Sequence, residues 1–163
     1  AALDPAAGQL APQVRVTATL VGDGPERARA EKYAQEHGLG DLVRFTGRLD
    51  PAGIREVFAE SDVYLQPSVK ESFGLAALEG RSAGLPVVAR SQTGTTQFVQ
   101  DGVQGLLAED DAGLARALVR LGHDRGLLER LTLHNRTTPP QDSWPHVLQI
   151  VRDAYARAGA SSD

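Results

Sequence analysis

The stretch that decides the fold is residues 70–88, KESFGLAALEGRSAGLPVV. Ser72 can cap a helix here, and Gly74 lets the backbone come close to a ligand, so the two residues suit the start of a helix. The small and apolar residues that follow predict a helix over 73–84. That helix runs directly into a buried strand predicted over 87–89. The stretch therefore indicates an α/β arrangement with a loop at the helix start.

The same alternation of strand and helix continues on both sides of this stretch. We expect strands over 14–21, 43–46, 63–65, 87–89 and 105–107. We expect helices over 26–38, 54–61, 73–84, 95–99, 111–124, 126–135 and 144–158. Short connections between mostly apolar strands predict a doubly wound parallel sheet, a Rossmann-like α/β domain with helices on both faces. We expect this single domain to span 1–158, with residues 1–12 as the remains of a helix and a disordered tail over 159–163.

Composition excludes several classes of function. The formal net charge is −4 and there is no dense run of lysine and arginine, so a nucleic-acid partner is not expected, and no basic face indicates membrane association. The chain has no cysteine, which excludes disulfides and thiolate catalysis. No apolar run reaches the roughly 20 residues of a membrane span. A soluble cytoplasmic protein is the simplest interpretation. The absence of methionine, even at position 1, indicates a piece of a longer protein.

Two carboxylates frame the predicted helix. Glu71 precedes it, and Glu79 lies eight residues later inside an otherwise apolar segment. A charge in such a place is costly unless something pairs with it. The N–H groups of Phe73, Gly74 and Leu75 should point outward at the helix start, where the dipole favours an anion. A ligand with a diphosphate and several hydroxyl groups, such as a nucleotide-sugar, would suit this arrangement.

The loops after the predicted strands should lie together at one rim. In doubly wound sheets, ligands bind beyond the carboxyl ends of the strands. Residues 22–24, 47–49, 67–74 and 90–94 all occupy such ends. The acidic run 109–111, by contrast, opens a helix and is interpreted as capping rather than as a metal site.

The residues around this rim resemble a known family. The run ESFGLAALE over 71–79, followed by AGLPVVA over 83–89, is similar to the E-x7-E segment of the retaining glycosyltransferases of family 4 (glycosyl transferases group 1), which have two Rossmann-like domains in the GT-B arrangement. Further matches in order and spacing are LVGDGPER at 20–27, VRFTGRL at 43–49, SDVYLQPS at 61–68, DGVQGLL at 101–107 and SW at 143–144. The resemblance covers roughly residues 14–155.

The resemblance implies a donor-binding role for the C-terminal domain of such an enzyme. Glu71, the catalytic candidate, would accept hydrogen bonds from hydroxyls of the donor sugar, and Glu79 would hold the ribose. The residues implied to contact the donor are Glu71, Ser72, Phe73, Gly74, Leu75 and Glu79, with Arg48, Leu49 and Asp50 near the base and Gly22 and Gly24 on the first rim loop. The substrate would be a UDP- or GDP-sugar, and no metal or other cofactor is implied.

Some parts of the family pattern are absent or altered. The Arg and Lys that neutralise the leaving diphosphate would precede residue 1, as would the first strand of the domain and the whole acceptor-binding N-terminal domain, the expected partner in the same polypeptide. The turn TGTTQ at 93–97 stands where the family has Gly-Gly-x-Pro-Glu, which puts its donor contacts in doubt. Alternatives are a GT-B-fold nucleotide-sugar epimerase or phosphorylase, or a non-catalytic α/β interaction domain. A two-carboxylate glycosidase is not favoured by this loop-then-helix placement.

Overall fold

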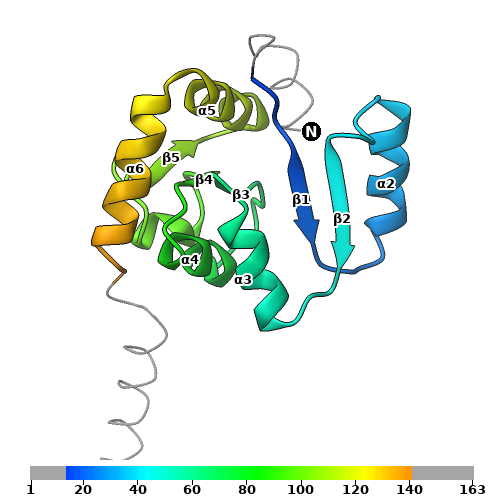
Figure 1. Cartoon of the computed structure of the whole chain (residues 1–163), viewed down its shortest axis with the longest axis horizontal. Helices are drawn as coiled ribbons and strands as arrows, with labels where there is room; N and C mark the ends of the chain where they lie inside the picture. The colour runs from blue at the N-terminus through cyan, green and yellow to red at the C-terminus, as the bar shows by residue number, and fades with distance from the viewer. Residues whose placement is uncertain (1–13, 141–163) are drawn as a thin grey trace, which may run out of the picture.

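The computed structural model describes residues 14–140 (Figure 1). The expected elements at 1–12 and 144–158, the motif at 143–144 and the tail at 159–163 lie outside the described residues. Within residues 14–140, no helix is both long enough and apolar enough to cross a membrane.

The described strands are all parallel to their neighbours, as predicted. They are β1 (Ala18–Val21), β2 (Val43–Gly47), β3 (Tyr64–Gln66), β4 (Val87–Arg90) and β5 (Gly105–Ala108). They do not form the single sheet that the sequence predicts. Instead β1 pairs with β2, and β3, β4 and β5 form a separate sheet in that order. Among residues 14–140, no strand lies between β1 and β3 to pair with both of them.

The helices lie close to the ranges predicted from the sequence. They are α2 (Arg27–Glu36), α3 (Pro51–Ala59), α4 (Leu75–Ser82), the 3₁₀ helix η1 (Gly94–Gln97), α5 (Asp111–His123) and α6 (Arg125–Thr137). Helix α3 begins earlier than expected because the Asp50 carboxylate accepts a hydrogen bond from the Gly53 N–H at 2.8 Å and Pro51 occupies the first turn. Asp110 caps α5 in the same way, so the interpretation of residues 109–111 as capping is confirmed.

The core lies on the two faces of the three-stranded sheet. All four residues of β4 are buried, and alternate side chains enter opposite layers. Val88 packs with the leucines of α5 and α6, while Val87 and Ala89 pack with Ala77, Leu78, Phe98 and Val99 on the side of α4 and η1. Helices therefore cover both faces of this sheet, as a doubly wound domain requires.

The β1–β2 pair is much less covered than the three-stranded sheet. Leu20 and Val21 are 39% and 44% exposed although both lie in a strand. Helix α2 buries only Ala34, and α3 buries no residue completely. The clusters of buried apolar residues come from residues beyond 62, so the stable centre of the described chain is the half that carries Glu71 and Glu79.

Candidate functional site

Glu71 lies in the loop that joins β3 to α4, at the carboxyl edge of the three-stranded sheet. Helix α4 begins at Leu75, two residues later than predicted, because Gly74 is its N-cap residue with a left-handed φ of 86°. Only glycine adopts this conformation without strain. The turn at Gly74 places the side chain of Glu71 back over the start of the helix.

The carboxylate of Glu71 is held at both oxygens. Its Oε1 accepts hydrogen bonds from the Gly74 N–H at 3.0 Å and the Phe73 N–H at 3.4 Å. Its Oε2 accepts one from Gln66 Nε2 at 3.1 Å. The expectation that Ser72 caps this helix is wrong, because the Glu71 carboxylate takes the N–H of the N-cap residue and no cap bond from Ser72 is recorded. Ser72 is exposed beside it.

This arrangement changes how the helix start could meet an anion. The sequence predicts that the N–H groups of Phe73, Gly74 and Leu75 face a ligand, but the first two are bonded to Glu71. The N–H of Leu75 lies at the first helical position, where the helix itself supplies no acceptor. An anion at this end would therefore bind beside Glu71 or displace its carboxylate from Gly74.

Tyr64 connects the two candidate carboxylates. Burial, the negative charge of Glu79 and the negative charge of Glu71, in that order, together raise the pKa of Tyr64 to about 12. The negative charges of both candidate carboxylates therefore act on one phenol. The Tyr64 hydroxyl donates to Gln66 Oε1 at 3.2 Å.

The turn at 93–97 packs against the loop that carries Glu71. The Gly94 N–H donates to the backbone carbonyl of Glu71 at 3.1 Å. A Cβ atom added at Gly94 would lie 1.9 Å from the Ser72 carbonyl oxygen, so only glycine allows the two backbones to approach this closely. Thr93 and Thr95 are buried in the same turn. The turn at 93–97 therefore contacts the loop that carries Glu71 through its backbone.

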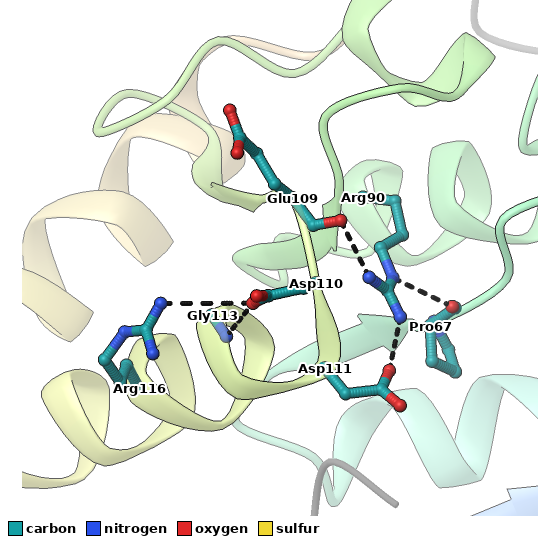
Figure 2. Close-up of polar contacts among 7 residues, drawn as sticks. All are labelled: Pro67, Arg90, Glu109, Asp110, Asp111, Gly113 and Arg116. Carbon is teal, nitrogen blue, oxygen red and sulfur yellow. Dashed lines mark hydrogen bonds and ion pairs between the residues drawn. The ribbon is translucent and has the colours of Figure 1, made fainter.

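Arg90 is a residue that the sequence did not single out. It ends β4 and is 8% exposed. Figure 2 shows its guanidinium donating to the Pro67 carbonyl at 3.3 Å, to the Glu109 carbonyl at 2.9 Å and to the Asp111 carboxylate. Arg90 thus joins the chain after β3, the end of β4 and the start of α5. The only signal in the sequence is a charged residue directly after the apolar run VVA.

The residues predicted to meet the base form a second group on the β1–β2 pair. Gly22 donates its N–H to the Gly47 carbonyl at 2.8 Å, and Gly24 is exposed in the turn before α2. Arg48 is exposed, Leu49 is half-buried, and Asp50 is committed to capping α3. No contact recorded among the described residues joins this group to Glu71. Over the same residues, no cluster of three or more His, Asp or Glu side chains could hold a metal ion.

Comparisons with known proteins show the family of this chain. A family model described as glycosyl transferases group 1 matches residues 2–124. The chain belongs to the group 1 glycosyltransferases. A D-inositol 3-phosphate glycosyltransferase of Thermomonospora curvata is 39% identical over 144 residues, and one of Streptomyces bingchenggensis is 32% identical over 152 residues. These matches cover 83% and 88% of this chain but only 32% and 33% of the relatives, so the chain spans about a third of their length.

Solved structures share the fold. Sucrose-phosphate synthase from Thermosynechococcus elongatus matches with a TM-score of 0.76 and 29% identity, over 99% of this chain and 42% of that one. Anabaena Alr3699/HepE in complex with UDP and glucose matches with a TM-score of 0.79 and 25% identity, over 96% and 44% of the two chains. The prediction of an α/β domain with parallel strands, matching the C-terminal Rossmann-like half of GT-B glycosyltransferases, is confirmed.

Proposed function

We propose that this group 1 glycosyltransferase domain binds the nucleotide-sugar donor of a retaining enzyme that transfers a hexose to an acceptor. One observation carries the proposal: the Glu71 carboxylate accepts a hydrogen bond from the N-cap residue of α4, at the carboxyl edge of the sheet. The Anabaena protein with a similar fold was solved with UDP-glucose, which supports a nucleotide-sugar as the ligand class.

The proposed roles follow from what each group offers. The Oε2 of Glu71 accepts a hydrogen bond from a sugar hydroxyl, and Glu79 accepts hydrogen bonds from the ribose. The N-terminus of α4, with the N–H of Leu75 first, faces the diphosphate, since the helix dipole favours negative charge there. Arg48, Leu49 and Asp50 would meet the base beside the first rim loop.

The chemical work in this proposal is electrostatic. As the glycosidic bond to the donor breaks, negative charge grows on the leaving diphosphate while the sugar becomes oxocarbenium-like. Preorganised dipoles at the start of α4 stabilise that charge without reorganising. By the family resemblance, the cationic partners of the diphosphate would lie in an upstream segment of the polypeptide. The proposal needs no metal ion or cofactor, and a cytoplasmic location stays a prediction.

Calorimetry with UDP, GDP and ADP tests the proposal. We expect the 163-residue chain to bind one of them weakly, and Glu79→Ala to weaken that binding by about tenfold, because a hydrogen bond to a charged group contributes about 1.5–3 kcal/mol. Glu56→Ala, which removes an exposed carboxylate from α3, is the matched control and should leave the affinity unchanged. An unchanged affinity in Glu79→Ala would contradict the ribose assignment.

The alternatives make different predictions for the same experiment. A folded wild-type chain that binds none of the three nucleotides would favour a non-catalytic interaction domain. A nucleotide-sugar epimerase or phosphorylase would also bind nucleotide or sugar phosphate. The family that matches this chain is the group 1 glycosyl transferases, and the two relatives described above are named glycosyltransferases. The comparisons therefore do not favour that alternative.

We also propose that the complete protein contains a further strand between β1 and β3. In Figure 1, β1 lies between β2 and the three-stranded sheet. Each of the two sheets ends at a parallel strand whose outer edge has no partner among residues 14–140. In a doubly wound sheet of order 3-2-1-4-5-6, removing strand 1 leaves two such pieces. An upstream segment of the same polypeptide, leading from an acceptor-binding domain, would supply that strand.

A further inference from the structure

A chain of hydrogen bonds runs from β3 to the Glu71 carboxylate. Tyr64 and Gln66 are two residues apart on β3, so their side chains leave the strand on the same face. The Tyr64 hydroxyl donates to Gln66 Oε1 at 3.2 Å, and Gln66 Nε2 donates to Glu71 Oε2 at 3.1 Å. Both hydrogen bonds are partly buried, which protects them from competition by water.

The direction of this chain is set by the chemistry of its ends. An ionised carboxylate only accepts hydrogen bonds, so it selects the amide N–H₂ of Gln66 and not its oxygen. The amide oxygen then faces the phenol, which must donate. Like any phenol, Tyr64 keeps its proton throughout the neutral range, and burial, with the charges of Glu79 and Glu71, raises its pKa to about 12. The glutamine amide therefore has one orientation that satisfies both neighbours.

The phenol at the start of the chain is itself held by packing. A Cβ atom added at Gly80 of α4 would lie 2.8 Å from two ring carbons of Tyr64, so the ring rests directly on the helix backbone. The ring of Phe58 in α3 meets it edge-on, with 6.1 Å between ring centroids and a 73° interplanar angle. Tyr64 is thus held between α3 and α4, and its hydroxyl in turn restrains the side-chain amide of Gln66.

We propose that Gln66, oriented by Tyr64, is a positioning residue that sets the Glu71 carboxylate for the donor sugar. This inference rests on the proposed function, in which Glu71 meets sugar hydroxyls. The backbone N–H groups at the start of α4 hold Oε1, and Gln66 holds Oε2. Because both oxygens are hydrogen-bonded, the orientation of the carboxylate plane is fixed. Each carboxylate oxygen has about two acceptor positions. The N–H groups of Phe73 and Gly74 take both positions on Oε1, and Gln66 takes one on Oε2, which leaves one position on Oε2 for a sugar hydroxyl.

The test compares UDP with UDP-glucose on the 163-residue chain. Gln66→Leu keeps the size of the side chain but removes the amide. We expect it to weaken binding of UDP-glucose by about tenfold and to change UDP affinity by less than twofold, because only the sugar reaches Glu71. Tyr64→Phe keeps the ring on Gly80 and should weaken UDP-glucose binding by a smaller factor. Gln35→Leu, an exposed glutamine on α2, is the control and should change neither affinity.

A second readout needs no ligand. The Gly74 N–H is bonded to Glu71 Oε1, so a displaced carboxylate should alter the chemical shift and speed the hydrogen exchange of that amide in Gln66→Leu. Equal losses for UDP and UDP-glucose, or a Gly74 amide unchanged by Gln66→Leu, would overturn the positioning role. If the wild-type chain bound neither ligand, the proposed function would fail, and the amide readout would still decide whether Gln66 sets Glu71.

Discussion

At the scale of single residues, Glu71 shows how a binding group can be prepared before a ligand arrives. A carboxylate free to rotate would lose side-chain entropy on binding a sugar. Here the start of α4 and Gln66 already restrict it. The same contacts satisfy a carboxylate that would be costly to leave half-buried without partners. The same hydrogen bonds therefore fix the position of the Glu71 carboxylate and offset the cost of burying its charge.

The titration of Tyr64 provides a prediction at this scale. Its pKa in the folded chain is about 12, whereas an unfolded tyrosine ionises near about 10. The folded state holds the proton more tightly, so this contribution to stability is fully present below about pH 10 and is lost as pH rises toward about 12. We expect ultraviolet titration to show one of the three tyrosines ionising last. Tyr64→Phe should remove that last step, and a variant that retained it would contradict the assignment.

Gly94 provides a second residue-scale prediction. Gly94→Ala places a methyl group 1.9 Å from the Ser72 carbonyl oxygen, a backbone atom that cannot rotate away. We expect a loss of about 1–3 kcal/mol in the free energy of unfolding, measured by urea denaturation, as for other overpacked positions. Gly40→Ala is the matched control, because an added Cβ there meets nothing within 4 Å. Equal effects of the two changes would show that the turn is not in close contact with the Glu71 loop.

At the scale of elements, Arg90 links three segments that are distant in sequence. Arg90→Ala removes hydrogen bonds to two carbonyls and the ion pair to Asp111 (Figure 2). We expect a loss of about 1–3 kcal/mol in urea denaturation, since buried acceptors lose their partner while Asp111 is half-exposed and screened. Arg116→Ala is the matched control: it pairs with Asp110 at 3.9 Å, is 70% exposed, and should cost less than about 0.5 kcal/mol. A similar small loss for both would contradict the linking role of Arg90.

The comparison of sequence with structure is also clearest for elements. Apolar runs, helical periodicity and turn residues located the described strands and helices well, because each is a local property of the chain. The exact start of α4 was not predicted, since it depends on the left-handed turn at Gly74 and on the Glu71 carboxylate folding back. Arg90 and Gln66 were missed because their partners lie on other segments, where spacing along the chain gives no signal.

At the scale of the whole molecule, the two separate sheets are the main departure from expectation. The β1–β2 pair exposes Leu20 and Val21 and contributes little to the core. We predict that a longer chain, with the upstream segment included, gains a parallel strand between β1 and β3. Hydrogen exchange of the amides of β1 should slow relative to the 163-residue chain, and the urea m-value should rise as more surface is buried. Unchanged exchange in β1 would contradict the added strand.

The sequence by itself determined the α/β class, the parallel strands, the order of elements and the family, because each depends on residue types at fixed spacings along the chain. Only the tertiary structure decided how Glu71 is held, which residues hold it, and that the two groups of predicted donor-binding residues lie on separate sheets. The physical reason is that these features depend on contacts between β3, β4, α4 and the turn at 93–97. Such contacts exist only after the chain has folded and brought those segments to one edge of the sheet.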